Sequence, residues 1–93
     1  MKVKFADDDL ARVECEKNYT AGLGADVVKG FRKAMGAIRA ATDSRDLYFG
    51  GLQTEKLKGP RQHQHSVRIN KQWRLIIQIK DETVDVQGIE DYH

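Results

Sequence analysis

The sequence predicts one α/β (α+β) domain spanning residues 1–93, with secondary structure in the order β-α-α-β-β-β. Three observations lead to this prediction. The chain has 93 residues, enough for one domain with a modest core. Apolar residues between 26 and 41 recur with the period of an amphipathic helix. From residue 65 onward the apolar period changes to two, which indicates successive strands.

The first strand and helix follow from the N-terminal pattern. Val3 and Phe5 alternate with lysines, as in a half-buried strand. Three aspartates at positions 7–9 then offer N-cap candidates and favourable charge for a helix that extends to about Asn18. A metal site is the weaker alternative, because three consecutive carboxylates on a helix cannot all face one ion.

The second helix is the clearest element. Residues 20–24 form a connector whose two glycines match neither the dinucleotide nor the phosphate-loop pattern, and Asp26 is expected to cap the helix that follows. Its basic residues fit either a solvated face or a nucleic-acid contact, and a short turn of helix is expected at Ser44–Leu47. The predicted apolar stripe consists of Val27, Phe31, Ala34, Met35, Ile38 and Ala41.

Three strands in succession, joined by short turns near residues 70–72 and 80–82, predict an antiparallel meander. If Ile69 and Trp73 both face the core, the first loop must have an odd number of residues. A three-residue loop pairs these two residues and places Arg68 opposite Arg74 on the outer face. Facing like charges destabilise a sheet, so an anion between the two arginines would explain the pairing. Solvation of both side chains is the alternative.

Charge is distributed unevenly along the chain. The overall charge is +2, but residues 52–78 hold six cations and one acid, a net charge of +5. Residues 79–93 hold one lysine and five acids, a net charge of −4. This pattern fits either a polyanion site with an acidic rim or solvated surface.

The remaining composition constrains the compartment. Cys15 is the single cysteine, so no internal disulfide can form, which suits the cytoplasm, and its side chain is expected to be buried or half-buried. The N-terminus does not have the pattern of a signal peptide, and no apolar run approaches the roughly 20 residues that span a bilayer.

The C-terminal third contains the groups that metal-free RNA cleavage requires. A 2′-hydroxyl attacks phosphorus while a base accepts its proton, an acid protonates the leaving oxygen, and cations stabilise the developing charge. Cations are abundant in this third, and the chain ends in Asp91-Tyr92-His93, a carboxylate, an aromatic ring and an imidazole. An exposed tail is the alternative for this end.

His63 and His65 are two residues apart, which would place them on one face of a strand, and with His93 they could bind zinc. This site is less favoured, because no further ligand motif accompanies it. His65 shares a face with Val67 and is instead expected to pack near the edge of the core.

These segments together resemble the HigB toxins, a family of the RelE/ParE superfamily of bacterial toxin–antitoxin systems. The resemblance covers about residues 50–93, whereas the N-terminal half agrees in plan only. Its motifs are specific in combination rather than singly. They are Glu55-Lys56-Leu57-Lys58-Gly59, then Ser66–Asn70, Gln72-Trp73-Arg74 and the final Asp91-Tyr92-His93.

The resemblance implies a RelE-like fold, with a small antiparallel sheet packed on two N-terminal helices. It implies a ribosome-dependent endoribonuclease (an mRNA interferase) that inhibits translation in the cytoplasm without metal or another cofactor. The implied partners are a HigA-like helix-turn-helix antitoxin, the 70S ribosome and mRNA, with operator DNA bound only through the antitoxin and no membrane involved.

Site residues follow from the matched motifs and from charge. The implied catalytic residues are Lys58, Arg74, Asp91, Tyr92 and His93. Expected RNA-binding residues are Lys56, Arg61, Arg68, Lys71 and Trp73, of which Arg68 rests mainly on the strand-pairing argument. Glu55 stands where many family members carry a histidine, so we consider it for proton transfer. Two alternatives stay open: a non-catalytic RNA- or partner-binding protein, and a gyrase-inhibiting toxin of the ParE type.

Overall fold

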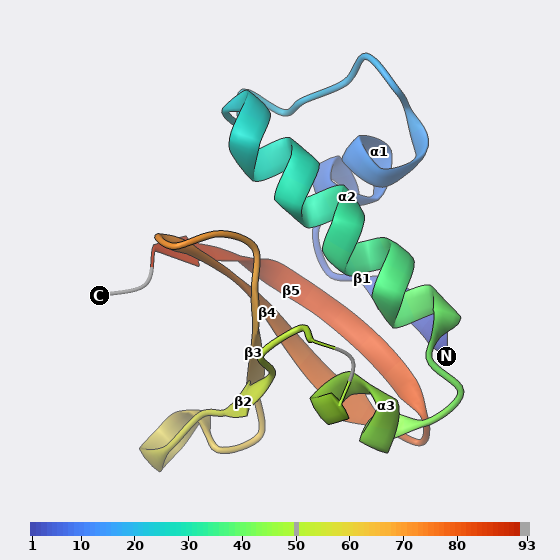
Figure 1. Ribbon diagram of the computed structural model, residues 1–93, viewed down its shortest axis with the longest axis vertical. Coiled ribbons are helices and arrows are strands. Elements are labelled where there is room, and N and C mark those ends of the chain that lie inside the picture. The colour runs from blue at the N-terminus through green and yellow to red at the C-terminus, as the bar shows by residue number, and fades with distance from the viewer. Residues whose placement is uncertain (50, 92–93) are drawn as a thin grey trace.

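A five-stranded sheet with helices packed on one face forms the domain (Figure 1). The computed structural model describes residues 1–49 and 51–91. The predicted element order is confirmed, with an additional short helix where a helical turn was expected and an additional two-residue strand. The elements are β1 (Lys2–Phe5), α1 (Asp8–Cys15), α2 (Ala25–Ala40), α3 (Ser44–Phe49), β2 (Glu55–Lys56), the 3₁₀ turn η1 (Gly59–Arg61), β3 (His65–Arg68), β4 (Trp73–Lys80) and β5 (Thr83–Asp91).

The sheet is antiparallel except at one edge. Its strand order is β1-β5-β4-β3-β2, and β1 pairs with β5 in parallel. The expectation of a purely antiparallel sheet was therefore wrong for β1. The cause is the connection, since helices lie between β1 and the later strands and allow the chain to enter the sheet in the same direction as β5.

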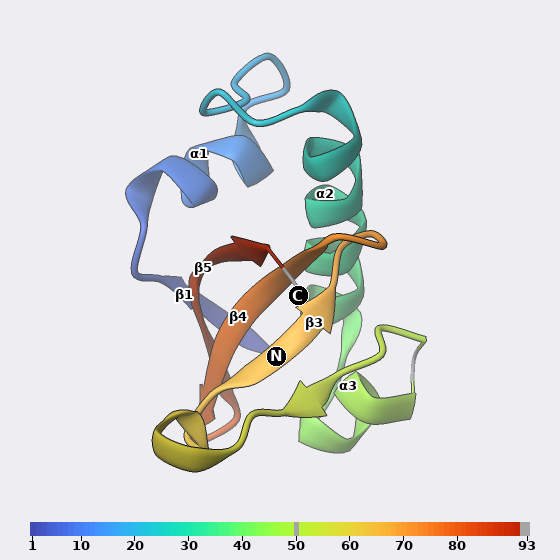
Figure 2. The same cartoon turned by 90° about the vertical axis from the view of Figure 1, so that its left-hand side faces the viewer.

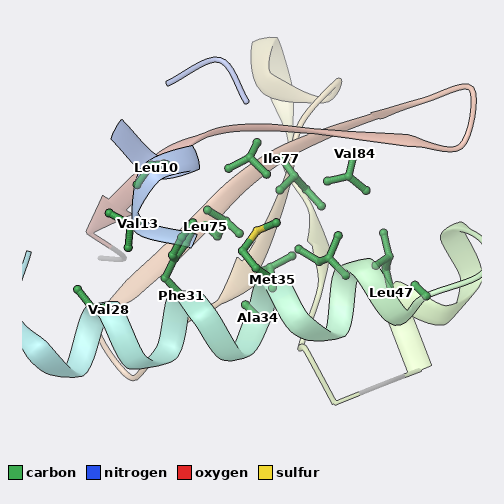
Figure 3. Close-up of a cluster of buried hydrophobic side chains, with 14 residues drawn as sticks. Leu10, Val13, Val28, Phe31, Ala34, Met35, Leu47, Leu75, Ile77 and Val84 are labelled. Carbon is green, nitrogen blue, oxygen red and sulfur yellow. The ribbon is translucent and has the colours of Figure 1, made fainter. Parts of the chain in front are cut away.

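The core lies between α2 and the inner face of the sheet (Figure 3). Every residue of the predicted α2 stripe is buried. Alternate residues of the strands meet this stripe, including Val67, Leu75, Ile77 and Val84, and Leu10 and Val13 of α1 close one end. No helix within residues 1–49 and 51–91 is both long and apolar enough to cross a membrane.

The end of α1, the exposure of Cys15 and the N-cap of α2 differ from what the sequence predicted. Asp7 caps α1 as predicted, accepting a hydrogen bond from the Asp9 amide at 2.8 Å, but α1 ends at Cys15 rather than near residue 18. Cys15 is exposed, because it lies about 200° around the helix from the buried Val13. The predicted cap at Asp26 was also wrong. The extended Gly24 is the N-cap of α2, and Asp26 lies inside the first turn.

Two of the basic residues on α2 hold the α1 segment in place. Arg32 donates to the backbone carbonyls of Val13, Glu16, Lys17 and Tyr19 at 2.9–3.3 Å. Arg39 forms a salt bridge with Glu14. These contacts connect the two helices, so for Arg32 and Arg39 the described structure supports a structural role.

The β3–β4 hairpin has the predicted register. Val67 pairs with Leu75 and Arg68 with Arg74, and the amide of Ile69 donates to the carbonyl of Trp73 across the three-residue loop. The next hairpin turns more tightly, at Asp81 and Glu82, which both have positive φ angles as in a type I′ turn.

A β-bulge shifts the face of the last strand. Ile77 pairs with Val86, but Ile76 pairs with Gly88, so Gln87 is an extra residue in β5. Strict alternation from the buried Val84 and Val86 would turn Glu90 toward the core. With the bulge, Ile89 packs against the core and Glu90 lies opposite Arg74, on the outer face. Figure 2 shows β3, β4 and β5 in order, with α2 behind them.

His65 packs at the edge of the core, as its position in the strand predicted. Its ring contacts Tyr48 of α3 edge-on, with centroids 5.9 Å apart. Burial and then the charge of Lys56 lower the pKa of His65 below its usual value of 6.5. His63 precedes β3, so the expectation that both histidines lie on one strand face was wrong. Within residues 1–49 and 51–91, no group of three or more His, Cys, Asp and Glu side chains is placed to hold a metal ion.

The lowered pKa of His65 predicts a pH-dependent stability. The folded state favours the neutral ring, so this contribution is complete above pH 6.5 and is lost as the pH falls from there toward the folded pKa. In urea unfolding at pH 8 and pH 5, His65→Gln should show a smaller difference in unfolding free energy between the two pH values than the wild type. His63→Gln is the matched control for loss of an imidazole. An unchanged difference in His65→Gln would contradict the assignment.

Gly30 allows α2 to approach the sheet closely. A Cβ at this position would lie 2.5 Å from the backbone oxygen of Ile69 and 2.6 Å from its Cγ2. Real Cβ atoms do not approach so closely, so any side chain at residue 30 must push the helix away from the β3–β4 hairpin. Gly36, on the same helix, has open space at the corresponding point.

These two glycines give a paired stability prediction. Gly30→Ala should lower the unfolding free energy by about 1–2 kcal/mol, because overpacking strain near the upper end of about 1–3 kcal/mol outweighs a helix-propensity gain of about 1 kcal/mol. Gly36→Ala, the matched control, should gain about 0.8–1 kcal/mol. Urea unfolding measures both changes. Equal effects of the two substitutions would show that the contact with Ile69 imposes no constraint.

Candidate active site

Arg74 is the centre of the candidate site. It projects from β4 on the face opposite the core, yet it is only 7% exposed. Its Nη1 donates to the backbone oxygen of Gln53 at 3.0 Å, and its Nη2 lies 3.8 Å from a carboxylate oxygen of Glu55. A guanidinium group can bind a phosphate in a bidentate manner, and that of Arg74 borders a hollow on the outer face of the sheet.

The predicted juxtaposition of Arg68 and Arg74 is confirmed, and the protein itself relieves part of the repulsion. Gln53 contacts both side chains: its amide oxygen accepts from Arg68 Nη1 at 3.0 Å, and its carbonyl accepts from Arg74. Its positive φ of 50° is uncommon for a residue with a side chain. Glu55 supplies the anionic charge beside Arg74. The carboxylate thus occupies part of the space in which an anion was expected.

A hollow of about 200 Å³ opens beside Arg74 on the outer face. Ser66 is 1% exposed at this hollow, and its hydroxyl has no hydrogen-bond partner among the described residues. Ser66 therefore contributes a polar group to a hollow whose lining also includes the apolar side chains of Leu57 and Ile76. The lining of the hollow consists of Leu57, Arg61, Ser66, Arg74, Ile76, Glu90 and Asp91.

Arg61 and Glu90 form a bridge at the hollow. Arg61 Nη1 and Nη2 donate to the two carboxylate oxygens of Glu90 at 2.8 and 2.6 Å, and Arg61 Nε donates to Gln64 at 2.8 Å. The hydrogen bond from Arg61 lowers the pKa of Glu90, and the same bond raises the pKa of Arg61. Arg61, predicted to bind RNA, is thus engaged with a carboxylate in the described structure.

The other predicted site residues are distributed over several surfaces. Lys58 is exposed at the start of η1, next to Leu57, which lines the hollow. Lys56 is exposed on the edge strand β2, and Lys71 is exposed in the β3–β4 turn. Lys56 and Lys58 both flank Leu57 in the chain, whereas Lys71 lies three residues before Arg74.

Trp73 is not brought together with Arg74. It is half-buried and lines a separate hollow of about 430 Å³ with Leu23 and Val27, beside the start of α2. Strand alternation explains this placement, because neighbouring residues of β4 point to opposite faces. A role for Trp73 in stacking on RNA therefore requires a surface other than the hollow at Arg74.

The predicted C-terminal trio is described only at its first residue. Asp91 ends β5 opposite Trp73, borders the hollow at Arg74, and accepts a hydrogen bond from Gln72 Nε2 at 3.2 Å. Tyr92 and His93 lie outside the described residues. Their predicted roles in catalysis therefore stay predictions.

Three residues at the site were not anticipated from the sequence. Glu90 reaches the outer face only because of the bulge, for which Gly88 within a strand was an available signal. Ser66 could have been placed beside Arg74 by the same alternation that located Arg68. Gln53 had no recognisable signal, since its contacts depend on the path of a loop.

Comparisons with known proteins agree on one family. The family model described as RelE-like toxin of type II toxin–antitoxin system HigB matches residues 3–93. A Proteus vulgaris protein named Endoribonuclease HigB is 30% identical over 78 residues, which cover 84% of this chain and 85% of the relative.

Solved structures show the same fold at low sequence identity. The YoeB–YefM complex from Staphylococcus aureus matches with a TM-score of 0.64 and 20% identity, covering 100% of this chain and 97% of the matched one. The YoeB/ParE toxin from Agrobacterium tumefaciens matches with a TM-score of 0.63 and 20% identity over 100% of both chains. YafQ from E. coli matches with a TM-score of 0.58 and 8% identity, covering 97% and 91%.

Proposed function

The chain belongs to the HigB family of RelE-like toxins from type II toxin–antitoxin systems, and from this membership we propose that it is an endoribonuclease that cleaves mRNA on the ribosome. Cleavage of translated mRNA in the cytoplasm would stop protein synthesis and growth. The name of the Proteus vulgaris relative, Endoribonuclease HigB, supports the chemical class. The position of Arg74 is the observation within the fold that carries the proposal.

Arg74 has the properties that phosphate chemistry requires. Its guanidinium is held in place by Gln53 and bordered by the hollow on the outer face, with Arg68 on the adjacent strand. A fixed cation of this kind stabilises charge that develops on phosphate oxygens without having to reorganise during the reaction. Lys58, at the start of the neighbouring loop, supplies the second cation. RNA on either side of the cleaved bond would contact Lys56, Arg68 and Lys71.

The proposed reaction requires no metal. The 2′-oxygen attacks the adjacent phosphorus and its proton passes to a base, while the bond from phosphorus to the 5′-oxygen breaks and that oxygen receives a proton from an acid. Glu55, whose carboxylate lies beside Arg74, is assigned the role of base. His93 is assigned the role of acid, with Asp91 orienting the chain end and Tyr92 contacting a base of the RNA. The products are a 2′,3′-cyclic phosphate and a 5′-hydroxyl.

Arg74→Ala should reduce cleavage of ribosome-bound mRNA by about 10²–10³-fold, the usual effect of removing one fixed donor to a developing oxyanion. His93→Ala should also reduce cleavage, because the leaving oxygen then lacks its acid. Single-turnover cleavage on purified ribosomes measures both, and circular dichroism verifies folding. Arg45→Ala, which removes an exposed arginine paired with Asp43, is the matched control.

Two results would contradict this assignment. If Arg74→Ala and His93→Ala both cut mRNA as well as the wild type does, these residues have no part in catalysis. A 5′-phosphate on the downstream product would exclude attack by the 2′-hydroxyl. Salt-sensitive RNA binding without cleavage products would instead identify a non-catalytic binder, and inhibition of gyrase without cleavage would identify activity of the ParE type.

Membership of a two-component toxin family also implies an antitoxin, and we propose a HigA-like helix-turn-helix protein that binds operator DNA and brings the toxin to it. The matched structure from Staphylococcus aureus is a complex of YoeB with YefM, which gives a precedent for a bound partner in this fold.

The antitoxin proposal predicts a small helix-turn-helix gene beside the gene for this chain. Its product should co-purify with the chain and relieve growth arrest when the two are co-expressed. Affinity purification and growth curves measure these two effects, with an unrelated helix-turn-helix protein as the control. A neighbouring product that neither binds the chain nor restores growth would contradict the proposal.

A further inference from the structure

Residues 57–64, which carry Lys58, cross the outer face of the sheet and are anchored there at two points on β5. Arg61 contacts Glu90 through both terminal nitrogens, and Gln64 Nε2 donates to Gln87 Oε1 at 2.6 Å. Gln87 Nε2 donates in turn to Gln78 of β4 at 3.1 Å. We call residues 57–64 the β2–β3 loop.

The bulge in β5 makes the anchor at Glu90 possible. Gln87 is the extra residue, and its side chain reaches the outer face, where it contacts Gln64 and Gln78. The change of register that follows brings Glu90 to the same face, opposite Arg74. Without the extra residue, Glu90 would face the core and could not meet Arg61. The bulge is therefore required for the anchor between Arg61 and Glu90.

All three nitrogen positions of the Arg61 guanidinium are engaged by protein groups. Nη1 and Nη2 contact Glu90, and Nε contacts Gln64 within the same loop. Glu90 and Arg61 both line the hollow at Arg74. The bridge is roughly half exposed, with side-chain exposures of 43% and 49%, so its contribution to global stability is small. The effect of the Arg61–Glu90 bridge is on the position of the β2–β3 loop.

We propose that Glu90 is a positioning residue, which holds the β2–β3 loop through Arg61 and so places Lys58 beside the phosphate bound at Arg74. Arg61 is then a tether rather than a direct ligand of RNA. The inference rests on the proposed ribonuclease activity. It adds that the bulged strand β5 controls the position of the second cation, Lys58.

Cleavage kinetics test the catalytic consequence. Glu90→Gln keeps the shape of the side chain but removes the charge that holds Arg61. Its kcat on ribosome-bound mRNA should fall about tenfold or more, because small displacements of a catalytic group are costly. KM should stay unchanged or fall, since a negative charge near the RNA is lost. Arg61→Gln should have the same effect, and the double variant should be no worse than either single variant.

Hydrogen–deuterium exchange tests the loop directly and does not depend on activity. Peptides that cover residues 57–64 should exchange faster in Glu90→Gln and Arg61→Gln than in the wild type. Glu16→Gln is the matched control, because it removes the carboxylate of another half-exposed Arg–Glu bridge, formed with Arg12 at the end of α1, which packs on the core side of the sheet. It should leave exchange and cleavage as in the wild type.

Each result decides a separate point. Unchanged loop exchange in Glu90→Gln would overturn the positioning role. Faster exchange with unchanged kcat would show that the loop is held but that its position does not matter for cleavage, which also overturns the proposal. Additive losses in the double variant would indicate that Arg61 contacts RNA directly. A wild-type chain that cuts no RNA would refute the ribonuclease function and the catalytic role of Glu90, whereas the exchange data would still decide whether Glu90 holds the loop.

Discussion

A guanidinium group that is almost fully removed from water requires oxygen atoms around it. Arg74 finds such atoms in Gln53, which lies between α3 and β2, and in Glu55, the first residue of β2. This requirement fixes the path of residues 53–55 along the outer face of the sheet. It also determines where β2 can join β3, and so where the β2–β3 loop begins. The arrangement of the whole candidate site therefore depends on how the charge of one side chain is accommodated.

Glu55 has a double character in this arrangement. It partly neutralises Arg74 in the free protein, and it is assigned the role of base in the proposed reaction. A bound phosphodiester would compete with Glu55 for the same guanidinium. If the carboxylate were displaced toward the 2′-hydroxyl, Arg74 could bind the phosphate and Glu55 could accept the proton. The resemblance to the HigB toxins places a histidine at this position in many family members, and a histidine lacks the permanent negative charge of Glu55.

Periodic spacing of apolar residues, in α2 and along the strands, allowed a large part of the structure to be predicted. The buried stripe of α2, the three-residue hairpin loop and the facing pair Arg68 and Arg74 all follow from regular periods and from the parity of one loop. The departures arise where a period is interrupted or is too short to detect. A two-residue strand shows no alternation, the bulge at Gln87 reverses parity, and contacts such as those of Gln53 depend on a loop conformation that no pattern encodes.

Within β4, neighbouring side chains serve different purposes. Leu75 and Ile77 pack against α2, whereas Arg74 and Gln78 face the surface where substrate is expected. The same eight residues of β4 therefore contribute to the candidate site on the outer face and to the core on the inner face. A substitution on the outer face of β4 can therefore remove groups of the candidate site while the inner face still packs against α2.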